Sequence, residues 1–203
     1  MQITELEIPD SYLVETNMFG DDRGLFLESF RYDRLQEITG RTFGIRQVNT
    51  SVSQAGVLRG IHFASVPQGQ AKYVTVHSGS IIDYIVDVRI GSETFGKWTS
   101  VTLDSTERNA VFLSEGLGHA FLSLEDNTVV SYLVSDIYKP ASEFGIYPLD
   151  SDIGLDLPAI FSSPILSGKD ESAPSFQIQS DQGILPTIAA CNELYFSQKA
   201  VKS

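Results

Sequence analysis

Three side chains that can move protons or bind anions lie close together in the sequence, at Arg59, His62 and Lys72. An imidazole can act as a general base near neutral pH, and an ammonium can stabilise negative charge that develops on an oxygen. If Lys72 begins the next strand of the same sheet, a hairpin connection would bring its ammonium near His62. The alternative is a hydrogen-bonded histidine within a strand and a solvated lysine at a sheet edge, with no shared chemistry.

The segment around His62 has the pattern of a β-strand that contains a glycine. Side chains alternate between the two faces of a strand, so Arg59 falls on the face of Val57 and His62 on the face of Leu58. Gly60 lies between them and indicates a bulge or the close approach of a ligand. The alternation places the arginine and the histidine on opposite faces.

Three histidines, His62, His77 and His119, are the candidate ligands of a metal site. The spacing Ser114-x-Gly116-x-x-His119 resembles the second half of the cupin signature. The first half of that signature needs two histidines one residue apart and a following glutamate, and His62-Phe63-Ala64 supplies only one ligand. A catalytic metal usually takes three protein donors. We therefore expect the double-stranded β-helix fold of cupins and no metal.

Another group of polar side chains is predicted on the strand 45–53, where Gln47, Asn49, Ser51 and Ser53 share one face. Polar side chains on one face of a strand are consistent with plain exposure to solvent. They are equally suited to line a polar pocket at the mouth of a barrel. Both interpretations stay open at this point.

The composition of the 203-residue chain limits its class and its partners. A net charge of −12 argues against a nucleic-acid-binding surface, although a nucleotide-sized anion can still bind where a few basic residues converge. No apolar run is long enough to span a bilayer, and the N-terminal residues lack the pattern of a signal peptide. The single Cys191 excludes an intrachain disulfide and indicates a reducing compartment. We expect a cytoplasmic protein that binds neither nucleic acid nor membrane.

Most of the chain consists of short apolar or alternating segments separated by turn residues, with few helical patterns. Such strands predict an antiparallel sandwich or barrel. We expect an all-β, cupin-like jelly roll that forms a single domain over 1–203, with its core at about 12–138 and a covering segment at about 139–203. Short peripheral helices are predicted near 31–40 and 187–198. In the predicted strand 25–30, Glu28 shares a face with Phe26 and Phe30, either as a solvated edge carboxylate or as part of a site.

Several separate segments together resemble the dTDP-4-dehydrorhamnose 3,5-epimerase family, metal-free cupins that act on deoxysugar nucleotides. The similarity runs from about Met18 to Pro174. Its carriers are Phe19-Gly20-Asp21-Asp22-Arg23-Gly24-Leu25-Phe26-Leu27-Glu28, Gln47-Val48-Asn49-Thr50-Ser51, Val57-Leu58-Arg59-Gly60-Ile61-His62-Phe63, Gln70-Ala71-Lys72, Val86-Asp87-Val88-Arg89, Ser92-x-Thr94-Phe95-Gly96-x-Trp98, Gly116-x-Gly118-His119-Ala120-Phe121, Tyr132, Tyr138-x-Pro140 and Ser167-x-Lys169-Asp170. Because these segments occur in the family's order, the resemblance is more specific than any single motif.

The resemblance implies epimerisation at C3 and C5, or at C3 only, of a dTDP-4-keto-6-deoxyhexose through an enolate, with no cofactor. It implies that His62 is the base, oriented by Asp170, and that Lys72 neutralises the oxyanion at C4. Tyr132 would return a proton from the opposite face of the sugar. Tyr138 is the competing candidate for this acid.

The resemblance also implies which residues bind the substrate. Arg59, with Arg23 and His119, would bind the diphosphate. The full set of implied substrate-binding residues is Arg23, Phe26, Glu28, Gln47, Asn49, Arg59, His119, Tyr138, Glu143 and Lys169. Some of these, Arg23 and Glu28 among them, would reach across the interface of a homodimer.

Departures from the usual family pattern put the pocket around C5 in question. Ala64 stands where a glutamine is common, Ser114 replaces a proline, Ala120 replaces a glycine, and 147–150 departs from a tryptophan followed by Asn-Asp. These features resemble the branch that serves antibiotic deoxysugars, in which some members invert only C3. Two alternative functions are a nucleotide-sugar 3,4-ketoisomerase on the same fold and a non-catalytic nucleotide-sugar-binding module. A binding module has no need for a base, its carboxylate partner and an acid together.

Overall fold

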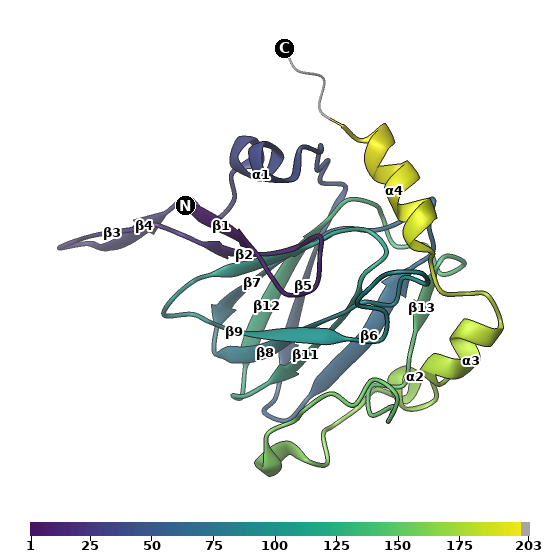
Figure 1. Cartoon of the computed structure of the whole chain (residues 1–203). Helices are drawn as coiled ribbons and strands as arrows, with labels where there is room; N and C mark the ends of the chain where they lie inside the picture. The colour runs from purple at the N-terminus through teal and green to yellow at the C-terminus, as the bar shows by residue number, and fades with distance from the viewer. Residues whose placement is uncertain (200–203) are drawn as a thin grey trace.

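Two antiparallel sheets face each other in the computed structural model, which describes residues 1–199 (Figure 1). The six-stranded sheet has, in spatial order, β1 (Gln2–Glu5), β2 (Ser11–Glu15), β10 (Ala110–Leu113), β7 (Lys72–Ser78), β12 (Thr128–Val134) and β5 (Gln47–Ser53). The five-stranded sheet has β13 (Glu143–Gly145), β6 (Leu58–Ala64), β11 (Gly118–Ser123), β8 (Ser80–Val86) and β9 (Trp98–Asp104). The predicted all-β jelly roll is confirmed, and β1 and β13 add strands outside the range predicted for its core.

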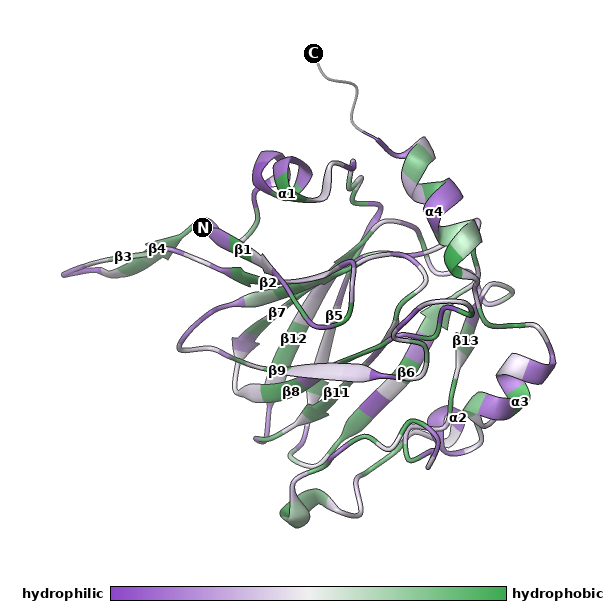
Figure 2. Ribbon diagram, in the orientation of Figure 1, coloured by the Kyte–Doolittle hydropathy of each residue, from purple (hydrophilic) through white to green (hydrophobic). Residues whose placement is uncertain are grey.

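Apolar side chains from both sheets form the layer between them. Val74 and Val130 of the six-stranded sheet pack with Ile85 and Leu103 of the five-stranded sheet, and all four are fully buried. They meet because every second side chain of a strand points to the same face. Figure 2 shows hydrophobic residues along the strands of both sheets.

Short helices lie around the sheets, including the two that the sequence predicts. α1 (Tyr32–Thr39) packs its buried Leu35 in a cluster with Phe112 of the six-stranded sheet. The chain after β13 forms η1 (Ala159–Phe161), α2 (Gly168–Glu171), α3 (Phe176–Asp181) and α4 (Ile188–Ser197). Phe176 and Leu185 pack on the outer face of the five-stranded sheet, and α2 contacts β6. Within the described residues, none of the helices is long and apolar enough to cross a membrane.

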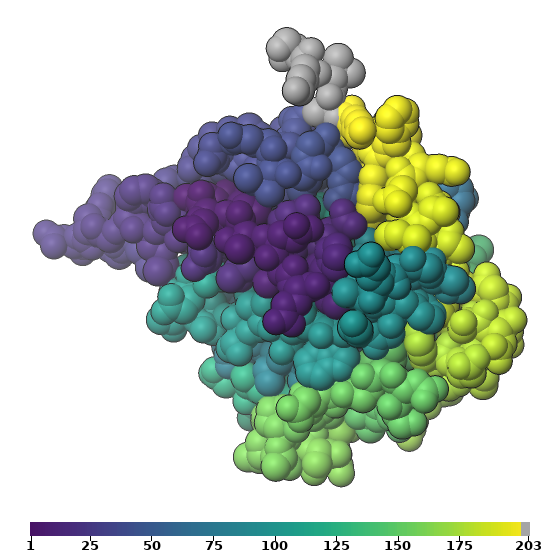
Figure 3. All heavy atoms as spheres, viewed as in Figure 1, coloured from purple at the N-terminus to yellow at the C-terminus, as the bar shows by residue number. Residues whose placement is uncertain are grey.

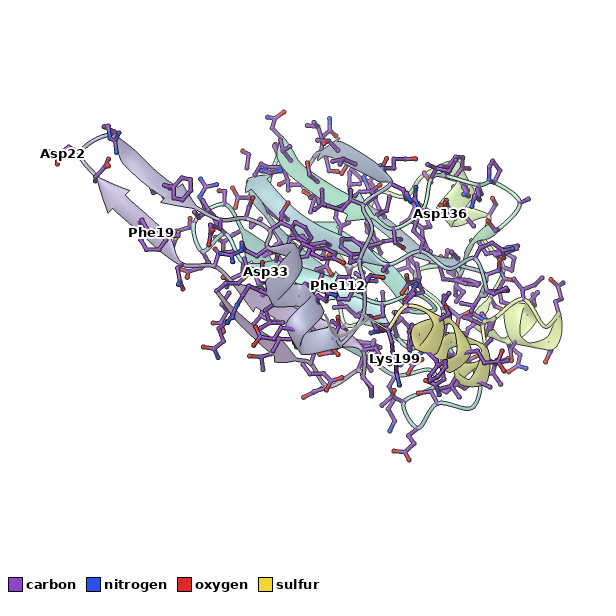
Figure 4. All side chains as sticks on the ribbon, turned by 90° about the horizontal axis from the view of Figure 1, so that it is seen from above. Phe19, Asp22, Asp33, Phe112, Asp136 and Lys199 are labelled. Atoms are coloured by element: carbon purple, nitrogen blue, oxygen red, sulfur yellow. The ribbon has the colours of Figure 1, made fainter. Side chains whose placement is uncertain are left out.

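A hairpin of β3 (Met18–Asp21) and β4 (Gly24–Leu27) projects from the two sheets (Figures 1 and 3). Figure 4 shows Asp22 at its tip and Phe19 along its length. Phe19 and Phe26 pair across the hairpin and are 59% and 66% exposed. Exposed apolar side chains that gather on one element are typical of a surface that another surface covers.

The strand predicted over 25–30 ends earlier, at Leu27. Glu28 follows it and pairs at the surface with Arg31, with 3.0 Å between the charged atoms. Phe30 packs edge-on against Tyr73, with the ring centroids 5.1 Å apart. Glu28 and Phe30 therefore do not share a strand face, because the backbone leaves the hairpin for α1 after Leu27.

Lys72 does not begin a neighbouring strand of the same sheet, so the hairpin connection considered in the sequence analysis does not occur. β6 pairs with β11 and β13, whereas β7 pairs with β10 and β12. The connection between β6 and β7 crosses from one sheet to the other. Lys72 therefore reaches the space near His62 from across the sandwich.

A β-bulge at Gly60 changes which face of β6 each side chain occupies. His62 pairs with His119 and Arg59 pairs with Phe121, so the two β6 residues between them lie opposite the single residue Ala120 of β11. Such a bulge shifts the alternation of the strand by one residue. Arg59 and His62 consequently line the same cavity, and the prediction of opposite faces is wrong. The bulge itself is what the glycine indicated.

Candidate active site

A cavity of about 190 Å³ lies between the sheets at the end near α2, and we call it the inner cavity. Its lining residues are Ser51, Arg59, His62, Lys72, His119, Phe121, Tyr132, Ser167, Lys169 and Asp170. A second space of about 510 Å³, the outer cleft, shares six of these residues. It adds Gln47, Val48, Asn49, Thr50, Gln70, Tyr138, Glu143 and Phe144. Together the two spaces form one continuous site.

The walls of the inner cavity come from different sheets. His62 and His119 are directly opposite each other on β6 and β11 of the five-stranded sheet. Lys72 pairs with Val134, and Tyr132 pairs with Val74, on β7 and β12 of the six-stranded sheet. Cross-strand partners share a face of a sheet, so the lysine and the tyrosine point to the same side. The histidines therefore face the lysine and the tyrosine across the cavity.

The His62 imidazole is held by Asp170, which lies on α2. Nε2 of His62 lies 2.6 Å from Oδ1 of Asp170, and the aspartate side chain is only 7% exposed. Burial raises the pKa of Asp170. The hydrogen bond and charge of His62 lower it, as does a hydrogen bond from Ser167, and together they outweigh burial, so the net shift of the pKa is downward. An ionised carboxylate only accepts, so the proton of the pair is on Nε2. Nδ1 is then the nitrogen that is free to act as a base.

Burial also decides the charge of His62 itself. It lowers the pKa of His62 from 6.5 and outweighs the opposing effect of Asp170, while Lys72 and Lys169 lower the pKa further. The imidazole is therefore neutral near neutral pH. A neutral imidazole with an ionised carboxylate behind it is the arrangement of a general base.

Lys72 and Tyr132 on the facing wall are suited to the opposite task. Burial lowers the pKa of Lys72 to about 8, against the nearby charges of Glu143 and Asp83, which raise it. The ammonium is thus still largely protonated near neutral pH. Burial raises the pKa of Tyr132, partly offset by Arg59, so its hydroxyl keeps its proton. This wall offers a cation and a proton donor.

His119 belongs to a second histidine–carboxylate pair that the sequence analysis missed. Its Nε2 lies 2.7 Å from Oδ2 of Asp83, which is fully buried, and the other carboxylate oxygen has no hydrogen-bond partner within residues 1–199. Asp83 also raises the pKa of Lys72. A carboxylate inside the apolar strand 81–86 was the available signal, because Asp is rarely fully buried unless it is paired.

The outer cleft carries the polar face predicted on β5. Gln47 donates to Asn49 Oδ1 at 2.6 Å, and its own Oε1 accepts from the backbone of Tyr138 at 3.0 Å. Glu143 accepts from the backbone of Lys139 at 3.1 Å. The pocket interpretation of Gln47 and Asn49 is confirmed, and Tyr138 lies at the rim with half of its surface exposed.

Three cationic side chains line both the inner cavity and the outer cleft, and one of them is Lys72. The other two are Arg59 and Lys169. The Arg59 Nε donates to Ser53 Oγ at 3.1 Å, which fixes the guanidinium on the β5 side. Converging cations with free donors suit a phosphate group at this junction.

Three of the predicted binding residues lie outside the inner cavity and the outer cleft. Arg23, Phe26 and Glu28 are on or next to the projecting hairpin, and they do not line the inner cavity or the outer cleft. The exposed Arg23 pairs with Asp21 on the same hairpin. A single chain therefore does not bring these three residues to the site.

The histidines and carboxylates of residues 1–199 do not form a group of three or more that could hold a metal ion. His62 and His119 each have their Nε2 engaged with a carboxylate. His77 lies on the exposed end of β7. The donor set at the site consists of two separate pairs rather than a coordination sphere.

Comparisons with known proteins agree with this geometry. The family model of dTDP-4-dehydrorhamnose 3,5-epimerase matches residues 5–177. A dTDP-4-dehydrorhamnose 3,5-epimerase of Mycobacterium tuberculosis is 45% identical over 187 residues, which cover 92% of this chain and 93% of the relative. A dTDP-4-dehydrorhamnose 3-epimerase of Streptomyces niveus is 43% identical over 191 residues, which cover 94% and 91%.

A solved structure resembles this chain in its fold as well as in its sequence. ChmJ, a 3'-monoepimerase from Streptomyces bikiniensis in complex with dTDP-quinovose, has a TM-score of 0.92 and 42% identity, and the match covers 96% of this chain and 98% of that chain. The similarity thus extends over nearly the whole chain. The chain belongs to the dTDP-4-dehydrorhamnose 3,5-epimerase family.

Proposed function

We propose that this protein epimerises a dTDP-4-keto-6-deoxyhexose, at C3 and C5 or at C3 only. The observation that carries the proposal is the His62–Asp170 pair, at 2.6 Å, in a cavity whose facing wall holds Lys72 and Tyr132. A base, an oxyanion stabiliser and an acid are the groups that inversion next to a ketone requires.

The chemistry follows from the position of the groups. Nδ1 of His62 takes the proton from the carbon next to the C4 ketone, and the electron pair of that C–H bond forms the enolate. The Lys72 ammonium stabilises the charge on the C4 oxygen. The Tyr132 hydroxyl then returns a proton to the same carbon from the other side, which inverts it. Exchange with solvent removes the proton from the imidazolium and restores the phenol.

Tyr132 is preferred over Tyr138 as the acid because of where each lies. Tyr132 lines the inner cavity together with His62, whereas Tyr138 lies in the outer cleft with half of its surface exposed. The nucleotide would occupy the outer cleft, against Gln47 and Asn49. The diphosphate would then lie at the junction, near Arg59.

We also propose a homodimer in which the hairpin of one chain completes the site of the other. This proposal is supported by the position of Arg23, Phe26 and Glu28, which the family resemblance implies for substrate binding but which lie on or next to the hairpin. The exposed Phe19 and Phe26 supply an apolar surface for the contact. A cytoplasmic location is proposed on the ground that Cys191 is buried as a free thiol.

The experiment is incubation of a dTDP-4-keto-6-deoxyglucose with the enzyme in deuterated buffer, followed by proton NMR. Loss of the C3 and C5 proton signals is expected if both carbons are inverted, and loss of the C3 signal alone indicates a 3-epimerase. His62→Ala should lower the rate of exchange by about 10²–10⁴-fold, because general base catalysis contributes that much.

The remaining outcomes contradict the proposal. Conversion to a 3-keto sugar without inversion would identify a ketoisomerase. Nucleotide binding without exchange at either carbon would identify a binding module. A His62→Ala variant that exchanges as fast as the wild type would remove His62 from the role of base.

A further inference from the structure

The carboxylate of Asp170 is held at both of its oxygens. Oδ1 lies 2.6 Å from Nε2 of His62, and Oδ2 accepts a hydrogen bond of 2.8 Å from the hydroxyl of Ser167. No other side-chain hydrogen bond to this carboxylate is present in the described part of the chain. The direction of Asp170 toward the base therefore depends on one hydroxyl.

Ser167 is itself held in place by the helix that carries Asp170. It is the residue immediately before α2, and its Oγ accepts from the backbone N–H of Asp170 at 3.1 Å. The hydroxyl thus accepts from the backbone of Asp170 and donates to its side chain. Such a reciprocal pair fixes the side-chain rotation of the aspartate relative to the first turn of the helix.

We propose that Ser167 is a positioning residue of the epimerisation reaction, which keeps Asp170 turned toward His62 so that Nδ1 of the imidazole faces the substrate. The proposal deepens the proposed function and rests on it. It assigns Ser167 no contact with the reacting carbons. Its effect passes through Asp170 and therefore through the basicity and orientation of His62.

A purely structural role for Ser167 would be that of a helix cap, and the chain offers a matched control for it. Ser175 precedes α3 and caps it in the same way, with its Oγ accepting from the N–H of Ile178 at 3.2 Å. Within residues 1–199, Ser175 does not line the inner cavity and makes no hydrogen bond to Asp170. Ser167→Ala and Ser175→Ala thus remove the same kind of cap, and only the first removes a donor to Asp170.

The test compares kcat, KM and the pH profile of wild type, Ser167→Ala, Ser167→Thr and Ser175→Ala. Ser167→Ala should lower kcat by roughly tenfold or more with little change in KM, because the lost hydrogen bond is made to a charged group. The acid limb of the profile should move to lower pH, since a misdirected carboxylate supports the imidazolium less. Ser167→Thr keeps the hydroxyl and should restore both values, and Ser175→Ala should resemble the wild type.

A readout without substrate separates this proposal from the proposed function. The pKa of His62 is measured by NMR of histidine-labelled enzyme, with His62→Ala for assignment. We expect a lower value in Ser167→Ala than in Ser175→Ala. Equal kcat, pH profile and His62 pKa in these two variants would overturn the role of Ser167, as would a folded Ser167→Thr that fails to recover. An inactive wild type with a shifted His62 pKa in Ser167→Ala would overturn only the proposed reaction.

Discussion

Lys72 shows how burial on one wall of the site sets the range of pH in which the enzyme works. Burial lowers the pKa of its ammonium to about 8, and the carboxylates of Glu143 and Asp83 oppose that shift. The charged form exists below this pKa and is lost as the pH rises through it. In the proposed reaction His62 acts in its neutral form, which is lost as the pH falls below its lowered pKa.

We therefore expect a bell-shaped profile of kcat/KM that falls above about pH 8. Lys72→Arg should lack this basic limb, because a guanidinium stays charged. Lys72→Met should lower kcat by about 10²–10³-fold, the cost of one oxyanion stabiliser. The measurement is kcat/KM from about pH 5.5 to about pH 9.5. A basic limb that is unchanged in Lys72→Arg would assign the titration to another group.

At the scale of residues, the sequence predicted the side chains but not the reason for their meeting. His62 and Asp170 lie 108 positions apart, and only the family resemblance connected them. Asp83 was missed because a single carboxylate in an apolar strand has no partner that spacing can reveal. The partner, His119, is 36 positions away on the adjacent strand.

The bulge in β6 is the element that turns Arg59 and His62 to the same side. Gly60 makes it possible, because its φ of 114° lies in the region that favours glycine. A Cβ on Gly60 would lie 2.4 Å from the carbonyl oxygen of His119 and 2.7 Å from Cα of Ala120. Both neighbours belong to the backbone of β11, which has little room to move.

Gly60→Ala should lower the free energy of unfolding by about 1–3 kcal/mol, because it forces a strained backbone and a steric overlap. It should also lower kcat, since β6 must shift and carry His62 with it. Gly44→Ala is the matched control, because a Cβ there meets nothing within 4 Å. The measurements are urea unfolding and kcat. A Gly60→Ala variant with wild-type stability and activity would contradict this role of the bulge.

At the scale of elements, local patterns predicted more than long-range pairing did. The helices predicted near 31–40 and 187–198 are confirmed by α1 and α4. The partner of β7 depends on a connection that crosses the sandwich, which no local pattern encodes. The strand 25–30 was drawn too long for a related reason, since the turn toward α1 is set by packing of Phe30 against Tyr73.

At the scale of the whole molecule, three residues that the family resemblance implies for substrate binding lie on or next to the projecting hairpin, away from the site of their own chain. If the hairpin of one chain completes the site of the other chain, mixed dimers can restore activity. We expect His62→Ala and Arg23→Ala/Glu28→Ala, each of low activity alone, to regain activity after subunit exchange. About a quarter of all sites should be intact in a symmetric dimer, because half of the dimers are mixed and each has one complete site.

The control for this exchange uses two variants whose substitutions both lie in the inner cavity of the same chain. His62→Ala mixed with Lys72→Met should regain nothing, because both residues of any one site come from the same chain. Native mass spectrometry establishes that subunits have exchanged. Mixed dimers without recovered activity, or a protein that sediments as a monomer while fully active, would contradict the shared site.

The single-domain assignment over 1–203 stays a prediction.

His62 and Tyr132 face the same cavity from opposite sheets, which has a consequence for how sequences of this family can vary. The distance between His62 and Tyr132 is set by the thickness of the apolar layer between the sheets, because the two residues lie on different sheets. A change of volume at a buried position such as Val74 therefore alters the reach of a proton transfer without touching the ligand. Two related sequences with the same polar residues but different interior volumes are therefore expected to differ in the rate of proton transfer.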